Sequence, residues 1–106
     1  MKRFTIAAAL TLATLAIGGA AAAQDPAPPY DQAPCELVHS LAQVTMLRRQ
    51  INESLPDVLA AFPDDSAYRA MVLSAYEVPR YTTPSYRGAA MDDFANAETL
   101  ACERRK

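Results

Sequence analysis

The sequence predicts an all-α fold, a small bundle of three main helices and one short helix that is stapled by one disulfide. Apolar residues recur at intervals of three and four in several stretches, as they do on one face of an α-helix. No alternation of apolar and polar β-branched residues continues for five positions, and the hairpin dipeptides Asn-Gly and Asp-Gly are absent. The two cysteines bracket the stretches that carry the helical pattern.

Residues 1–23 are expected to be a secretory signal peptide. Lys2 and Arg3 precede an apolar run from Phe4 to Ile17, and small residues follow it up to position 23. A membrane anchor is the alternative, but the apolar run is short for the ~30 Å hydrocarbon core of a bilayer. We therefore predict a periplasmic or secreted protein with no stable membrane insertion after cleavage.

The remaining 83 residues are enough for one domain. The leader holds two of the ten basic residues and no acidic one, so eight basic and twelve acidic residues remain, a formal charge of −4. Nucleic acid is not an expected partner, because binding to a phosphate backbone needs a clustered positive face.

Residues 24–34, QDPAPPYDQAP, hold four of the eight prolines and little apolar surface. This composition is typical of an extended, mobile tether that joins no core. We therefore expect a flexible linker over residues 24–34 and a helical domain over residues 35–106.

The first helix of the domain is expected from Cys35 to about Asn52. At 100° per residue, one broad apolar face contains Leu37, Val38, Leu41, Val44 and Ile51. Arg48 projects from the same face, where its methylenes can lie on the core while its guanidinium reaches the rim. Pairing of Arg48 with a carboxylate or an anion is the alternative.

A break at residues 52–55 and a short helix from about Leu55 to Phe62 are expected next, because the residue before a proline avoids helical angles. Ser54 and Asp57 have the spacing of a capping box, with Asp in place of the usual Glu or Gln.

The third helix is expected from about Ser66 to Glu77, after candidate capping residues at positions 64–66. Its core face contains Tyr68, Val72, Ala75 and Tyr76. Pro79 ends it.

The fourth helix is expected to begin at Pro84, with Thr82 or Thr83 as its cap, and to reach about Glu103. Its core face contains Tyr86, Ala90, Phe94, Ala97, Leu100 and Ala101. Gly88 costs ~1 kcal/mol inside a helix. Either a neighbour packs closely on Gly88 or the regular helix begins just beyond it.

Cys35 and Cys102 are expected to form the disulfide, because the protein is predicted to enter an oxidising compartment. A reactive thiol pair is the alternative. Cys35 also lies four residues from His39, as a nucleophile and base or two metal ligands would. No second histidine completes a zinc set, and no Gly-rich phosphate loop or Ser-centred elbow is present. We therefore predict no catalytic residue, metal or cofactor, and a protein that is not an enzyme.

The stretch YEVPRYTTPSYRG, residues 76–88, combines tyrosines with arginines, a composition enriched at binding hot spots. The candidate binding residues in this stretch are Tyr76, Arg80, Tyr81 and Arg87. In the structural alternative, Tyr76 and Tyr86 point inward, the prolines shape the corner, and Arg80 pairs with an acid.

Four short segments resemble a group of short, uncharacterised exported proteins of bacteria and phages: CE at 35–36, RRQ at 48–50, SAYEVPRYTT at 74–83 and DDFANAETLAC at 92–102. The resemblance implies the helical architecture and no particular activity. The positions it marks are Cys35, Arg49, Gln50, Tyr76, Pro79, Arg80, Tyr81, Phe94 and Cys102. The resemblance adds Arg49 of the first helix to the candidate binding residues.

From these patterns we expect a non-catalytic interaction module that binds another exported or envelope protein through residues 76–88. The alternative is an acid- or stress-responsive periplasmic chaperone, because acid would neutralise its twelve carboxylates and a small stapled domain could then expose apolar helix faces.

Overall fold

The computed structural model describes residues 27–106, so the expected leader and residues 24–26 lie outside the described residues. The described chain contains no strand, and the predicted all-α fold is confirmed. Its elements are η2 (Tyr30–Gln32), α1 (Cys35–Gln50), α2 (Leu55–Ala60), α3 (Ser66–Tyr76) and α4 (Pro84–Arg104).

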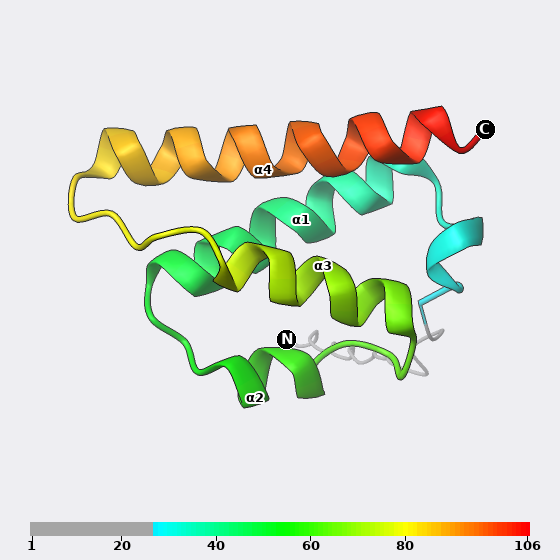
Figure 1. The fold of residues 1–106 in the computed structure, drawn as a ribbon, viewed down its shortest axis with the longest axis horizontal. Helices are drawn as coiled ribbons and strands as arrows, with labels where there is room; N and C mark the ends of the chain where they lie inside the picture. Colours follow the sequence, from blue (N-terminus) through cyan, green and yellow to red (C-terminus); the bar gives the residue numbers. More distant parts are fainter. Residues whose placement is uncertain (1–26) are drawn as a thin grey trace, which may run out of the picture.

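Helices α1 and α4 lie side by side and antiparallel, and α3 packs against another side of α1 (Figure 1). The pairing of α1 with α4 is the most extensive in the described chain. Helix α2 lies beside α3, away from α4. Where the three longer helices meet, the core contains Val38, Ala42, Met46, Met71, Ala75, Phe94 and Ala95.

The end of α1 is fixed by the backbone of the turn that follows it. Asn52 adopts a left-handed conformation with φ of 67°. The N–H of Glu53 donates to the carbonyl of Arg48 at 2.9 Å, and the N–H of Asn52 donates to that of Arg49 at 3.1 Å. This is a Schellman motif, which asparagine tolerates better than most residues other than glycine. It explains the break that the sequence predicts at residues 52–55.

The starts of α2 and α3 are capped as predicted. The Oγ of Ser54 accepts the N–H of Asp57 at 3.4 Å, which forms half of the predicted capping box. The Oδ1 of Asp65 accepts the N–H of Ala67 at 2.8 Å and that of Tyr68 at 3.4 Å.

Part of the predicted linker belongs to the core. Tyr30 and Ala33 are buried. The Tyr30 ring packs edge-on against Tyr68 with centroids 5.1 Å apart, and its hydroxyl donates to Glu98 Oε1 at 2.8 Å. The prediction of a mobile tether is therefore wrong for residues 30–33. A single tyrosine whose ring and hydroxyl both find partners anchors a segment that proline content alone would leave free.

The orientation of α1 differs from the prediction. Val38 is buried, but Val44 and Ile51, which were predicted on the core face, are 46% and 59% exposed. Leu37 and Leu41 are only partly buried. The prediction is wrong because α1 carries apolar residues on two opposite sides, and the apolar pattern alone does not show which side meets the core.

The residues at the two ends of α1 determine which side of the helix is buried. Cys35 is joined to Cys102 by the predicted disulfide, with a Cα–Cα distance of 5.7 Å, and both residues are buried. At the other end Gln50 is fully buried. Because both end residues must point inward, the residues of α1 that face the core are Cys35, Val38, Ala42, Thr45, Met46 and Gln50.

Helix α4 follows its predicted core face only near its middle. Ala90 and Phe94 are buried as predicted, whereas Tyr86 and Leu100 are 63% and 50% exposed. Ala97 and Ala101 are exposed as well, and Ala95 and Cys102 are buried in their place. Alanines on several sides of this helix weaken its apolar pattern, and the disulfide at Cys102 determines which side faces α1.

Gly88 lies inside the regular part of α4, since this helix begins at Pro84. A Cβ added at Gly88 would meet no atom within 4 Å. Both explanations that the sequence suggested for this glycine are therefore wrong.

Candidate functional site

The centre of the candidate site is the connection between α3 and α4, residues 77–83, which the end of α1 holds in place. The side-chain amide of Gln50 donates from Nε2 to the carbonyl of Pro79 at 2.9 Å and accepts the N–H of Tyr81 on Oε1 at 2.8 Å. One buried glutamine thus satisfies a main-chain acceptor and a main-chain donor of the connection.

Arg49 adds a second set of contacts beside Gln50. Its Nε donates to the carbonyl of Val78 at 2.9 Å, and its guanidinium carbon lies 5.3 Å from the centre of the Tyr76 ring. The Tyr76 hydroxyl donates to the main-chain carbonyl of Glu53 at 2.6 Å. Desolvation, followed by the nearby Glu53 carboxylate, raises the pKa of Tyr76. This tyrosine therefore ties the end of α3 to the turn after α1.

Arg87 holds the connection from the side of α4. Its Nε donates to the carbonyl of Tyr81 at 2.9 Å. We call Arg49, Gln50 and Arg87 the clamp. Together the clamp residues bind main-chain groups of Val78, Pro79 and Tyr81.

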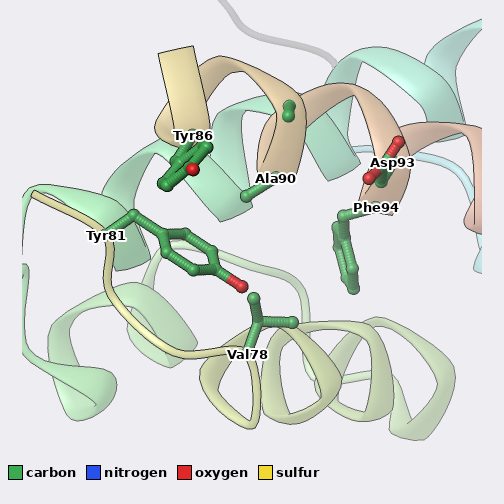
Figure 2. Close-up of a pocket in the computed structure, with 7 residues that line it drawn as sticks. Val78, Tyr81, Tyr86, Ala90, Asp93 and Phe94 are labelled. Carbon is green, nitrogen blue, oxygen red and sulfur yellow. The ribbon is translucent and has the colours of Figure 1, made fainter. Parts of the chain in front are cut away.

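A groove opens between the clamped connection and the first half of α4, with a volume of about 500 Å³. Figure 2 shows the Tyr81 ring reaching across the groove towards Val78, with Phe94 on the far side. The rings of Tyr81 and Tyr86 are in an edge-to-face arrangement, 6.0 Å between centroids and 72° between planes. The residues that line the groove are Val78, Tyr81, Tyr86, Ala89, Ala90, Asp93 and Phe94.

The predicted binding residues fall into three groups in the structure. Tyr81 lines the groove. Arg49, Tyr76 and Arg87 hold the backbone of the site through the Nε atoms of the two arginines and the hydroxyl of the tyrosine. Arg80 is exposed and forms no ion pair within residues 27–106.

The structural alternative is therefore only partly right. Tyr76 points inward as that alternative expected, but Tyr86 is 63% exposed and lines the groove instead. Arg80 has no acidic partner in the described chain.

Sequence reasoning from the 76–88 stretch missed Val78, Ala89 and Asp93 as lining residues. The predicted face of α4 contained the signal for the rest of the wall, because Tyr86, Ala90 and Phe94 lie four residues apart and all three line the groove. Nothing in the local pattern marks Val78 or Asp93, which join the wall only through the path of the connection.

The pair formed by Cys35 and His39 has no free thiol, because Cys35 is oxidised in the disulfide. The His39 Nδ1 lies 2.9 Å from Thr99 Oγ1, which itself donates to the carbonyl of Ala95 at 2.7 Å. Thr99 therefore accepts a hydrogen bond, and the proton between them belongs to His39 Nδ1. His39 thus links α1 to α4 at the disulfide end of the molecule.

Within residues 27–106, no three His, Cys, Asp or Glu side chains are grouped so that they could hold a metal ion. Of the helices in this range, none has the length and apolar character needed to cross a membrane. Comparison of the chain with family models, with curated proteins and with solved structures finds no match. The functional proposal therefore rests on the groove and the clamp.

Proposed function

We propose that the protein is a non-catalytic binding module that holds an apolar segment of another exported or envelope protein in the groove. The observation that carries the proposal is the groove of about 500 Å³, which is lined by Tyr81 and Tyr86. The clamp fixes the backbone of Tyr81, and Tyr86 is held by helix α4. Tyrosine supplies a large contact area with few rotatable bonds and is enriched among residues that dominate binding energy.

The clamp favours binding because it reduces the ordering that a partner would have to impose. Four hydrogen bonds from clamp side chains reach main-chain groups of the connection. A loop that is already ordered loses little conformational entropy when a partner binds. Tyr81 is therefore presented in its binding position before any partner arrives.

The lining of the groove also indicates the chemistry of the segment. Asp93 is the one charged residue in a lining that is otherwise aromatic or aliphatic. A carboxylate beside two tyrosine faces favours a cation, through ion pairing and cation–π contact. The proposed segment therefore carries an apolar side chain next to a lysine or arginine.

Capture of envelope proteins on the immobilised protein tests the proposal, with bound proteins identified by mass spectrometry after crosslinking. Tyr81→Ala should abolish capture of a specific partner, and Asp93→Asn should reduce it about tenfold, which corresponds to ~1.4 kcal/mol. Asp92→Asn is the matched control, because Asp92 is the adjacent carboxylate and does not line the groove. Identical partner lists for the wild type and Tyr81→Ala would rule the groove out.

Arg80→Ala separates the groove from the exposed cation beside it. Arg80 does not line the groove, so its loss should leave capture within about twofold of wild type. A partner that is lost with Arg80→Ala and kept with Tyr81→Ala would place binding on the outer surface of the connection.

An acid-responsive chaperone is the second candidate, and one observation favours it. The segment around Tyr30 is attached to the domain by Asp65, whose Oδ2 accepts the N–H of Tyr30 at 3.1 Å while Oδ1 caps α3. Hydrogen bonds from the N–H groups of Tyr30, Ala67 and Tyr68 lower the pKa of Asp65. Because this pKa is lowered in the folded state, its stabilising effect is present above pH ~4 and is lost as pH falls further.

Circular dichroism and aggregation-suppression assays between pH 7 and pH 2 test this second candidate. It predicts suppression of client aggregation only in acid, when the Tyr30 segment is released. Asp65→Asn, which keeps an acceptor oxygen but removes the charge, should shift the onset of suppression towards neutral pH. A protein that stays folded and inactive down to pH 2 eliminates the chaperone.

A further inference from the structure

The main chain beside the groove has few free hydrogen-bonding groups. The carbonyls of Val78, Pro79 and Tyr81 accept hydrogen bonds from the clamp, and the N–H of Tyr81 donates to Gln50. The N–H of Val78 donates to the carbonyl of Ala75 at 3.1 Å, and proline has no N–H. A partner strand pairs with alternate residues of an edge, and the engaged residues occupy both alternations. A partner that adds a β-strand to this connection would therefore have to break clamp hydrogen bonds.

The side chains of the groove offer hydrogen-bond donors. Tyr81 and Tyr86 line it, and within residues 27–106 neither hydroxyl has a hydrogen-bond partner. A hydroxyl group can donate one hydrogen bond to a carbonyl of a ligand. Within a helix most carbonyls are already paired with N–H groups of the same helix, whereas the carbonyls of an extended segment are free. The two hydroxyls therefore favour an extended segment over a helical one.

The α4 wall of the groove carries two rings with a hollow between them. Tyr86 and Phe94 are eight residues apart, which is ~12 Å along the helix. The small side chains of Ala89 and Ala90 line the groove between these positions (Figure 2). Tyr81 comes from the connection on the other side, and its ring centroid lies 6.0 Å from that of Tyr86. The groove is thus short, aromatic at its rims and hollow in the middle.

A polyproline II segment fits these dimensions. It rises ~3.1 Å per residue, so two prolines three residues apart are separated by ~9 Å, and the groove holds about four residues. Proline-rich segments dock in aromatic-lined grooves, and their conformation is formed before binding, so little entropy is lost. Proline also has no N–H, so a proline-rich segment needs few acceptors from a lining that offers mainly donors and apolar surface.

Charge complementarity determines what flanks the prolines. Asp93 lines the groove beside Phe94 (Figure 2) and forms no ion pair within the described residues. Arg80 and Arg87 do not line the groove, so the lining carries one negative charge and no positive one. A lysine or arginine at the Phe94 end of the segment can pair with Asp93, whereas an acidic residue there would be repelled.

We propose that the occupant of the groove is a proline-rich segment of an exported or envelope protein, in polyproline II conformation, with two prolines three residues apart and a lysine or arginine beside them. The inference rests on the proposed function, since it names the chemistry of the segment that the groove holds. The prolines lie between the Tyr81 ring and the α4 wall. The hydroxyls of Tyr81 and Tyr86 donate to main-chain carbonyls of the segment, and its cation pairs with Asp93.

Peptide titrations of the isotope-labelled protein, followed by NMR, test the proposal, because they detect weak binding and show where it occurs. The first probe is a set of peptides with two prolines three residues apart and an arginine on either the N-terminal or the C-terminal side. One of the two placements of arginine should shift the amide signals of Ala89, Ala90 and Asp93. Replacing both prolines of that peptide by alanine should weaken binding at least tenfold, and so should replacing its arginine by glutamate.

Tyr81→Phe is the most discriminating variant of the protein, because it keeps the ring and removes only the hydroxyl. It should weaken binding of the proline-rich peptide about three- to tenfold, since a carbonyl of the segment loses its donor. Asp93→Asn should weaken binding about tenfold, and the control Asp92→Asn should stay within about twofold of wild type, since Asp92 does not line the groove. Circular dichroism melts check that each variant stays folded.

A second probe, an amphipathic helical peptide with one arginine, separates this inference from the proposed function. Suppose that the helical peptide binds the groove and the proline-rich peptides bind no better than their alanine versions. The polyproline inference is then overturned, while the groove remains a binding site. If no peptide of either kind shifts the amides of the groove, the polyproline inference is overturned as well. Capture of envelope proteins with Tyr81→Ala then decides the proposed function on its own.

Discussion

The two ends of the α1–α4 pair are held together by different means. At one end, which we call the closed end, the disulfide joins Cys35 to Cys102 and the Arg105 guanidinium carbon lies 4.9 Å from the centre of the Tyr30 ring. At the other end, the groove end, the end of α1 binds main-chain groups of the α3–α4 connection through Gln50 and Arg49. A disulfide and aromatic contacts hold the closed end together, and hydrogen bonds hold the groove end together.

The tyrosines have opposite environments at the two ends. At the closed end the ring of Tyr68 is buried and its hydroxyl donates to the carbonyl of Pro28 at 2.8 Å, while Tyr30 is buried against it. At the groove end Tyr81 and Tyr86 line an open groove. Because the clamp binds main-chain groups, the side chains of Tyr81 and Tyr86 remain free for other contacts. In the aromatic cluster of the closed end, the rings and hydroxyls of Tyr30 and Tyr68 are already engaged with partners. The side chains of the closed end therefore stabilise the fold, and the groove end is where we propose that a partner binds.

The largest expected effect is at the closed end. Replacing both cysteines, Cys35→Ser with Cys102→Ser, should lower the free energy of unfolding by roughly 4 kcal/mol, because the disulfide closes a loop with a sequence separation of 67. Urea unfolding followed by circular dichroism measures this. A loss below ~1 kcal/mol would mean that the aromatic contacts around Tyr30 hold the closed end without the disulfide.

The clamp at the groove end is tested by Gln50→Ala, which should lower the free energy of unfolding by about 2 to 3 kcal/mol. The substitution leaves the partly buried carbonyl of Pro79 and N–H of Tyr81 without their partner. Gln43→Ala is the control on the same helix and should change stability by less than ~0.5 kcal/mol, since the Gln43 amide makes one exposed 3.5 Å contact with Asp92.

Gln50→Glu sharpens the same prediction through its pH dependence. A buried carboxylate cannot donate to the Pro79 carbonyl, but a protonated carboxyl can. Burial should raise the pKa of the introduced group in the folded state, so its stabilising contact is present in acid and is lost as pH rises. The difference in stability from wild type should therefore shrink between pH 7 and pH 4. A constant difference would show that the donor role of Gln50 is unimportant.

The contribution of Tyr30 to the stability of the closed end can be tested by raising the pH. Desolvation, and then the hydrogen bond to Glu98, raise the pKa of Tyr30 to about 12. Because this pKa is raised in the folded state, the contribution of Tyr30 is complete below pH ~10 and is lost as pH rises from there through 12. Tyr30→Phe should lose about 1 kcal/mol at pH 7 and should lose less additional stability than wild type between pH 10 and 12. Tyr86→Phe, at the exposed groove end, should behave like wild type in both ranges.

The smallest expected effect is a gain of stability at the groove end. Gly88→Ala should raise the free energy of unfolding by about 1 kcal/mol, because a methyl group at this helical position meets no atom within 4 Å. Thermal melts measure the change, and partner capture should be unaffected because Gly88 does not line the groove. Loss of stability in this variant would show that the backbone around Gly88 needs the freedom of glycine.

The all-α class and the capped starts of α2 and α3 could be predicted because they depend on local patterns, whereas the expected cap Thr83 makes no side-chain hydrogen bond at the start of α4. The disulfide could be predicted because the chain has only two cysteines. Ser54 and Asp65 are strong capping residues at the expected positions, and prolines mark the helix boundaries. The buried face of α1 could not be predicted, because both of its sides are apolar and contacts distant in sequence choose between them. Part of the apolar pattern that suggested a core face lies on the exposed side of α1, which carries Val44 and Ile51.

The groove, too, could be predicted only in part, because some of its residues are placed by contacts that are distant in sequence. Its α4 wall was visible as the spacing of Tyr86, Ala90 and Phe94, but the position of Tyr81 depends on Gln50, which lies 31 residues earlier in the chain. The anchoring of Tyr30 depends on Glu98, 68 residues away. Neither of these contacts leaves a signature in the nearby sequence.

The closed end has a practical consequence for how the molecule can be attached to a surface. Tyr30 lies against Arg105, so the short helix η2 and the end of α4 lie at the same end of the molecule (Figure 1). Tyr86 is twenty residues before Lys106, which places it ~30 Å away along α4. A label, tag or bead linked after Lys106 will therefore point the tyrosine-lined groove outward into solution, so immobilisation through this terminus keeps the proposed binding surface accessible.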